Sequence, residues 1–128
     1  MRPPRPGLAW SRGRYRRRAC YGAWMASAEW QATRRAWYQA HLAHRGAPPA
    51  CAVCRAAWEL RRGDLHHRSY ERLGVETYPD LVPLCRACHD RLHLILETVP
   101  AWRRLPRAYA TDLLVAALGR QVARSAHD

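Results

Sequence analysis

The sequence predicts a small α+β domain that a bound metal ion holds together. Two Cys-x-x-Cys pairs, Cys51 with Cys54 and Cys85 with Cys88, have the spacing of zinc ligands. Helical patterns precede and follow this region, and a short segment between the pairs has the pattern of a strand. A chain of 128 residues has room for one modest core. A metal ion would therefore supply stability that such a core lacks.

The charge of the chain favours a polyanionic partner. All 22 basic residues are arginine, and the formal net charge is +12. The planar guanidinium group of arginine binds phosphate oxygens in pairs, which suits contact with a nucleic-acid backbone. We therefore expect nucleic acid as the partner, rather than an acidic metabolite. The alternative is a basic protein that has no role on nucleic acid.

Cellular location bears on the role of the cysteines. No apolar run approaches the ~20 residues of a membrane span, and no apolar segment follows the N-terminal arginines as in a secretory signal. We expect a cytoplasmic protein with no membrane partner. In that setting Cys-x-x-Cys pairs are typical of metal sites rather than of disulfides, and the separate Cys20 is expected to be a free thiol.

Residues 1–20 are predicted to form a flexible basic arm. The first 18 residues contain seven arginines and three prolines, and none of them is acidic. Such a segment has no apolar periodicity from which to build a core. It would either follow the phosphates of a nucleic acid and add salt-dependent affinity, or remain a solvated tail.

Residues 24–44 are predicted to form a helix, the first element of a domain over 21–97. Ser27 is a good N-cap, and Gly46 stands where a helix would end. Trp30 and Trp37 lie at helical spacing and are expected to pack as a core stripe against the metal-binding region. The other face carries arginines that could contact phosphate, Arg34 and Arg35.

The region over 51–97 alternates between turn, strand and helix. A turn is predicted over 61–64, a strand over 65–70, an irregular loop over 71–83 and a helix from Leu84 to Pro100. Residues 98–128 are predicted to form a helical extension, with its helix running from about Pro106 or Thr111 to Arg124. Its apolar face is expected only to pack, and no residue in it suggests chemistry. That face comprises Leu113, Leu114, Ala117 and Leu118.

The four paired cysteines are predicted to bind a structural zinc ion. Each Cys-x-x-Cys pair places two thiolates on one side of an ion, and the two pairs together complete a tetrahedron. The 30 residues between the pairs are more than a zinc ribbon has, so a further substructure is expected between them. The alternative is redox-active or incidental thiols.

The histidines are predicted to form a second metal site. His89 and His93 are four residues apart on a helix, so one cation can be held from the same face. A facing strand could supply a third ligand, either His66 or His67. Neighbouring strand residues point to opposite sides, so the other one would be available as a general base. The alternative is a set of surface histidines.

The same stretch resembles the HNH endonuclease family. Residues 65–74 contain His-His-x-x-Tyr-x-x-Leu-Gly, followed by residues 80–89 with the second cysteine pair. The resemblance covers about residues 24–93 in order and is closest to the subgroup with two Cys-x-x-Cys zinc knuckles. It implies a ββα-metal fold, in which a hairpin and a helix hold one divalent ion. The fold class expected is thus a zinc-stabilised ββα-metal core flanked by an N-terminal and a C-terminal helix.

The resemblance also implies roles for individual residues. His67 would be the general base, and His66 a ligand of the catalytic metal. Asp80 takes the place of the middle asparagine of the motif, which fixes the hairpin loop. His89 would be a catalytic metal ligand, and His93 a further one.

Two residues depart from the family pattern. Asp80 lacks the amide donor of asparagine, so it would bond backbone N–H groups or cap the loop instead. His66 stands where aspartate is common, which makes the ligand set all imidazole. Such a set favours Mn²⁺, Ni²⁺, Zn²⁺ or Co²⁺ over Mg²⁺.

The function implied is metal-dependent hydrolysis of DNA phosphodiester bonds, by nicking or by double-strand cleavage. His67 would take a proton from water, and Arg68 or Arg91 would contact the phosphate. One alternative is a zinc-stabilised DNA-binding or scaffold module whose active site has decayed. Another is a nuclease component of a larger phage packaging or restriction assembly.

Overall fold

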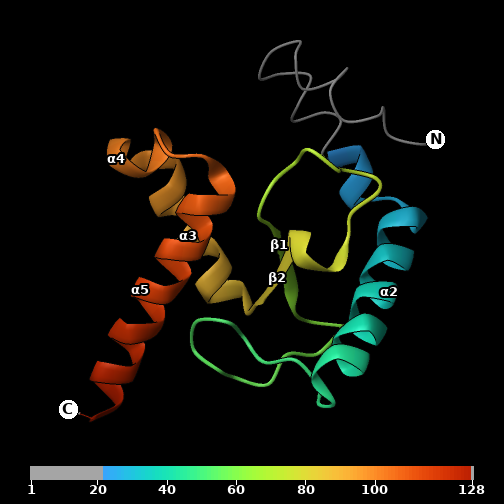
Figure 1. Ribbon diagram of the computed structural model, residues 1–128, viewed down its shortest axis with the longest axis horizontal. Coiled ribbons are helices and arrows are strands. Elements are labelled where there is room, and N and C mark those ends of the chain that lie inside the picture. The colour runs from blue at the N-terminus through green and yellow to red at the C-terminus, as the bar shows by residue number, and fades with distance from the viewer. Residues whose placement is uncertain (1–21, 128) are drawn as a thin grey trace.

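The computed structural model describes residues 22–127, with two antiparallel strands and several helices in a small α+β fold (Figure 1). The predicted arm and Cys20 lie outside the described residues. No described helix is long and apolar enough to cross a membrane. In chain order the elements are α2 (Ala28–Arg45), β1 (Asp64–His67), the 3₁₀ helix η2 (Tyr78–Asp80), β2 (Leu81–Leu84), α3 (Arg86–Thr98), α4 (Pro100–Arg103) and α5 (Arg107–His127).

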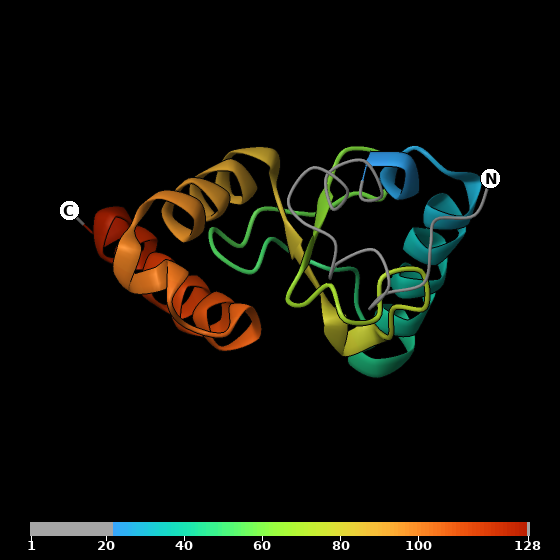
Figure 2. The same ribbon diagram turned by 90° about the horizontal axis from the view of Figure 1, so that it is seen from above.

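The hairpin of β1 and β2 lies between two groups of helices. α2 lies on one side of it, and α3, α4 and α5 lie on the other (Figure 2). In the hairpin His66 pairs with Val82 and His67 pairs with Leu81. Successive strand residues face opposite sides, so His66 faces α3 while His67 faces α2.

An aromatic cluster fills the space between α2 and the hairpin. Trp30 and Trp37 are 2% and 4% exposed, so the prediction that they form a core stripe is confirmed. This cluster supplies one of the two cores of the fold. Its buried members are Trp24, Trp30, Trp37, Trp58, Leu65, Leu73 and Leu81.

An aliphatic cluster fills the space between the hairpin, α3 and α5. It includes the buried Cys51, so the first cysteine pair is part of this core. Burial of these side chains from both α3 and α5 holds the C-terminal helix on the domain. The other buried members are Val53, Leu84, Leu92, Leu96, Ala110, Leu114 and Leu118.

The ends of α2 follow the capping signals in the sequence. The Ser27 side chain accepts a hydrogen bond from the Trp30 backbone N–H, so the predicted N-cap is confirmed. The helix therefore begins at Ala28 and not at residue 24, and residues 22–25 form a separate helical turn. At the other end Gly46 has a φ of 69°, the left-handed conformation that glycine adopts without strain.

The prediction of an irregular loop over 71–83 is wrong at the C-terminal end of that segment. Residues 78–84 form η2 and β2, while β1 is shorter than the predicted strand and ends at His67. Pro83 had indicated a loop because proline cannot donate a ladder hydrogen bond. In a sheet of two strands both are edges, and the Pro83 carbonyl accepts from the Ala52 backbone N–H at 2.9 Å.

The two long C-terminal helices differ from the prediction at their boundaries. α3 begins at Arg86, because Leu84 ends β2 and the Cys85 sulfur caps the helix by accepting from the Cys88 backbone N–H. α5 extends past the expected end at Arg124 to His127. Leu113, placed on the apolar face, is 42% exposed and lies outside the core.

Candidate functional site

The four paired cysteines converge at one point beside the aliphatic cluster. Their sulfur atoms all lie within 4.8 Å of one another, and none of the four forms a disulfide. The sulfurs of Cys54 and Cys85 are 3.9 Å apart. A tetrahedral ion with Zn–S bonds of ~2.3 Å places sulfurs about 3.8 Å apart, so this group could hold a zinc ion.

Backbone N–H groups prepare the buried member of this group for metal binding. Burial would raise the pKa of the Cys51 thiol. Hydrogen bonds from the backbone of Cys54, Cys85 and Val53 outweigh this effect and lower the pKa to about 7. The thiolate is the form that binds metal, so the fold around Cys51 favours the ligand state.

A second group consists of His66, His89 and His93. Each offers one ring nitrogen, and these atoms all lie within 4.8 Å of one another. His89 and His93 share a face of α3 because they are one turn apart, and β1 directs His66 toward them. Strand alternation alone left His66 and His67 open as the third ligand, and the resemblance implied His66; the structure brings His66 to the group.

The second nitrogen of each ring is hydrogen-bonded to another side chain. His66 Nε2 lies 3.0 Å from Thr111 Oγ1, His89 Nδ1 lies 2.9 Å from Asp64 Oδ2, and His93 Nδ1 lies 3.1 Å from Glu97 Oε1. Metal-binding histidines are usually oriented in this way by a second partner. The opposite nitrogens, His66 Nδ1 and His89 Nε2, are buried without a hydrogen-bond partner among the described residues. Such orphaned acceptors fit a cation.

Burial favours the neutral state, which is the one that binds a cation, for two of the three imidazoles. Burial lowers the pKa of His66 well below its usual value, and the nearby Arg107 and His93 lower it further. Burial also lowers the pKa of His93. The side chains of His89 and His93 remain 15% and 26% exposed, so the group reaches the surface through these two rings. Three protein ligands with a free fourth position are typical of a catalytic metal site.

His67, the predicted general base, lies on the other face of the hairpin. Its side chain is fully buried and stacks on Trp30, with ring centroids 5.1 Å apart. Its Nε2 is 2.8 Å from Glu76 Oε2, and the same oxygen accepts from Trp24 Nε1. Among the described residues, His67 is not part of the three-histidine group. Glu76 was not predicted as a site residue, and nothing in its local sequence indicates this contact.

Asp80 stabilises the loop between the strands rather than the histidine group. Its carboxylate accepts from the Thr77 backbone N–H at 2.7 Å, which confirms the expected bond to a backbone N–H. It also accepts from the Thr77 hydroxyl and pairs with the Arg72 guanidinium. Arg72 is the main reason that the pKa of Asp80 lies well below its usual value.

Three of the four arginines predicted to contact DNA are bonded within the chain. Arg34 donates to the carbonyls of Leu60 and Gly63. Arg68 forms a two-point ion pair with Asp112, and Arg91 donates to Gln121 at 2.5 Å. The fourth, Arg35, is exposed on α2.

α5 contributes to the site, so the expectation that it only packs is wrong. Thr111 is fully buried and contacts His66. Arg107 donates from Nε to the His67 carbonyl at 3.0 Å and lies over the Tyr70 ring, while its buried Nη2 has no partner among the described residues. One signal could have indicated Thr111, because it is a polar residue on the same helical face as Leu114 and Leu118.

Comparisons with protein-family models, with curated proteins and with solved structures gave no match for this chain.

Proposed function

We propose that this chain is a metal-dependent endonuclease of the HNH type, which hydrolyses DNA phosphodiester bonds at one divalent ion held by His66, His89 and His93. The observation that carries the proposal is the three-histidine group itself. Its rings are oriented by partners from three separate segments, and its three ligands would leave the fourth position of a tetrahedral ion free for water or substrate. A purely structural site would be closed by a fourth protein ligand.

The order of the elements around the group supports the proposal. β1, β2 and α3 follow one another in the chain, and the ligands come from β1 and α3. This is the arrangement expected of a ββα-metal core. The four cysteines lie at its edge, where a zinc ion would tie the segment before β1 to the start of α3.

The chemistry is divided between the ion and the protein groups. The ion would neutralise charge on the phosphate and lower the pKa of a bound water. His66, His89 and His93 hold their nitrogens in place through Thr111, Asp64 and Glu97.

We assign the proton transfer to His67. Glu76 accepts a hydrogen bond from His67 Nε2 in the neutral tautomer, which makes Nδ1 the basic nitrogen. The pairing with a buried carboxylate fixes the orientation of the ring. Water must reach the ring beside Trp30 for this step, because the His67 side chain is buried.

The burial of His67 favours a second candidate function. A module that binds DNA and holds both metals without hydrolysing the backbone needs no accessible base. In that case Glu76 and His67 would be a buried polar pair that orders the aromatic cluster.

A plasmid-cleavage assay with Mn²⁺, Ni²⁺, Co²⁺, Zn²⁺ or Mg²⁺ tests the proposal. We expect His67→Ala to keep the metal and to lose about 10²–10⁴-fold in rate. We expect His66→Ala to weaken metal binding and to lose activity for that reason. His44→Ala, at an exposed position on α2, is the matched control and should retain both properties.

Cleavage separates the two candidates from each other, because both would hold two ions per chain. Two ions per chain with cleavage support the nuclease. Binding of DNA with wild type and His67→Ala equally inert across the metals would leave the non-hydrolytic module. If His67→Ala loses the metal and His66→Ala keeps it, the roles within the pair are reversed.

A further inference from the structure

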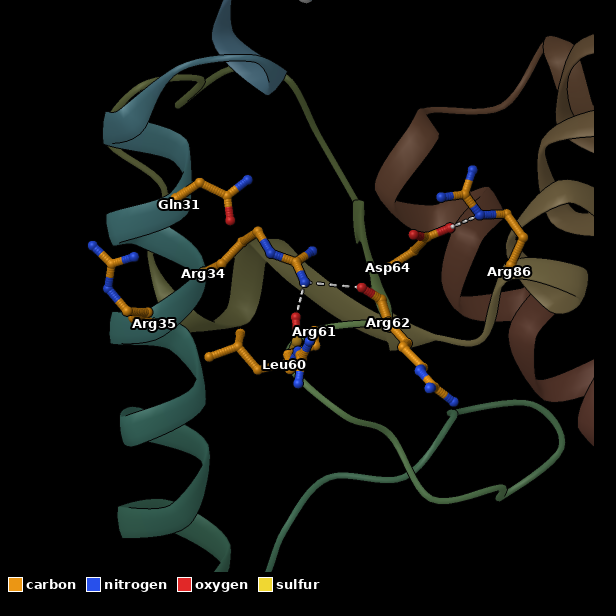
Figure 3. A pocket seen from close by; sticks show the side chains of 9 residues that line it. Gln31, Arg34, Arg35, Leu60, Arg61, Arg62, Asp64 and Arg86 are labelled. Carbon is orange, nitrogen blue, oxygen red and sulfur yellow. Dashed lines mark hydrogen bonds and ion pairs between the residues drawn. The ribbon is translucent and has the colours of Figure 1, made fainter.

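A concave surface lies beside the histidine group, and most of the residues that line it are arginines. We call it the arginine pocket. It has a volume of about 370 Å³ and lies between α2, the turn before β1 and the start of α3 (Figure 3). Asp64 is the one acidic residue among the described residues that line it. Its arginines are Arg34, Arg35, Arg61, Arg62 and Arg86.

The base of the pocket is fixed by the turn that precedes β1. Arg34 reaches from α2 to the carbonyls of Leu60 and Gly63, as the dashed lines in Figure 3 show. Gly63 has no room for a side chain, because an added Cβ would lie 2.1 Å from the Trp58 indole. The turn therefore packs directly on the aromatic cluster. It presents the exposed Arg61 and Arg62 from a backbone that is already ordered.

The pocket remains positive despite Asp64. The Asp64 carboxylate pairs with Arg86 Nε at 3.1 Å, and the same oxygen accepts from His89. Arg35, Arg61 and Arg62 have no such partner among the described residues. An anion that enters the pocket would meet guanidinium groups whose charge is not yet paired.

Asp64 also shows how near the pocket is to the histidine group. Its side chain contacts Arg86 on the pocket side and His89 on the metal side. The two sites thus share one carboxylate, and a continuous polyanion can contact both at once. A single free phosphate cannot.

We propose that the arginine pocket binds a backbone phosphate of the nucleic acid next to the phosphate that lies at the histidine group. The proposal rests on the proposed function to the extent that nucleic acid is the substrate. Arginine suits this task because its planar fork binds phosphate oxygens without reading the bases. The pocket therefore sets the position and affinity of the strand and carries no sequence preference.

The test compares two pairs of adjacent arginines that differ only in location. Arg61→Ala/Arg62→Ala removes two guanidinium groups from one rim of the pocket. The control, Arg103→Ala/Arg104→Ala, removes the same charge near the end of α4, on the opposite side of the molecule from α2 (Figures 1 and 2). All four residues are exposed, so both variants should fold, and the melting temperature and zinc content verify this.

The readout is the affinity for a fluorescent DNA duplex between about 50 and 200 mM salt, with no divalent ion added. For the pocket pair we expect weaker binding and a salt dependence that is shallower by about 1 in log–log slope, because the pocket would hold one phosphate and each lost phosphate contact removes about one unit. The control pair should change the slope by clearly less. Arg35→Ala, a single change on α2, should lower it by no more than the pocket pair does.

Each outcome decides the proposal. Equal slopes for the pocket pair and the control pair would overturn it. It is also overturned if inorganic phosphate raises the melting temperature through Arg61 and Arg62 while the slope for DNA is unchanged, since the pocket would then bind free phosphate only. Failure of the nuclease proposal looks different, because wild type would be inert on plasmid while the pocket pair still lowered the slope.

Discussion

The cysteine group and the histidine group both bring possible metal-ligand atoms together, but different parts of the chain hold those atoms in place. Among the four cysteines, Cys51 is prepared for metal binding by nearby backbone N–H groups, which lower the pKa of its thiol. Two of the three histidines depend on side chains from distant segments, with Thr111 at 45 and Asp64 at 25 residues from the ring each one orients. The first group offers four ligands, which would close a tetrahedral site, whereas the second offers three, which would leave one position open.

From this difference we propose that the cysteine group would stabilise the fold and that the histidine group would be the one to act on a substrate. A closed tetrahedron contributes its binding free energy to folding and leaves no position for a substrate. An open group needs partners that hold the ligands still, because the ion cannot do this alone. We therefore expect damage to the cysteines to unfold the chain, and damage around the histidines to weaken one metal and spare the fold.

The largest effect is expected for Cys85→Ser. Serine still caps α3, as the Cys85 sulfur does now, but it removes a thiolate ligand. Structural zinc sites contribute binding free energy of about 10–16 kcal/mol, which is as large as the whole ~5–15 kcal/mol stability of a typical domain. We expect loss of zinc and of the cooperative thermal transition, measured by metal analysis and circular dichroism.

Ala87→Ser is the control for Cys85→Ser. It adds a hydroxyl at an exposed position in the first turn of the same helix and should keep zinc and fold. A chelator should reproduce the Cys85→Ser result on wild type. A cooperative transition in Cys85→Ser without zinc would show that the two hydrophobic clusters suffice for the fold.

Thr111→Val should affect the histidine group alone. Valine keeps the shape of the side chain but removes the hydroxyl that contacts His66 Nε2, and the site is fully buried. Loss of such a partner typically costs about 10–100-fold in metal affinity. Competition with a metal-binding dye measures this, and zinc at the cysteines should be unchanged.

Thr98→Val is the matched control for Thr111→Val. Thr98 is also a helical threonine, but it is exposed and bonds only the Leu94 carbonyl. It should leave the metal affinity unchanged. Equal affinities for Thr111→Val and wild type would mean that Thr111 packs against His66 without orienting it.

The same contrast explains what the sequence could predict. Both ligand sets depend on short sequence spacings, such as the i, i+4 separation of His89 and His93. Such spacings can be read from the local sequence. The partners of His66 and His67 belong to other segments. Glu76 therefore gave no usable signal as a site residue, and Thr111 gave only its place as a polar residue on the apolar face of α5. The alternation of strand residues predicted that His66 and His67 would differ, and it could not say which one faced α3.

The fold was predicted best where capping or apolar residues are decisive. Ser27 and Gly46 mark the ends of α2, and the Trp30 and Trp37 stripe is buried as expected. β2 was missed because Pro83 argues against a strand unless the strand is at an edge. That condition depends on the number of strands in the sheet, which is a property of the whole fold.

The smallest effect is expected for Glu97→Gln, because the partner of His93 lies at the surface. The Glu97 side chain is 66% exposed, and glutamine keeps an oxygen that can accept from His93 Nδ1. Exposed pairs of this kind contribute about 0–1 kcal/mol, so metal affinity should fall by no more than about fivefold. Glu71→Gln, an exposed change of the same charge near β1, should have no effect. A loss as large as that of Thr111→Val would mean that orientation of the ring matters equally at the buried and the exposed ligand. The open side of the histidine group would then be as rigid as its buried side.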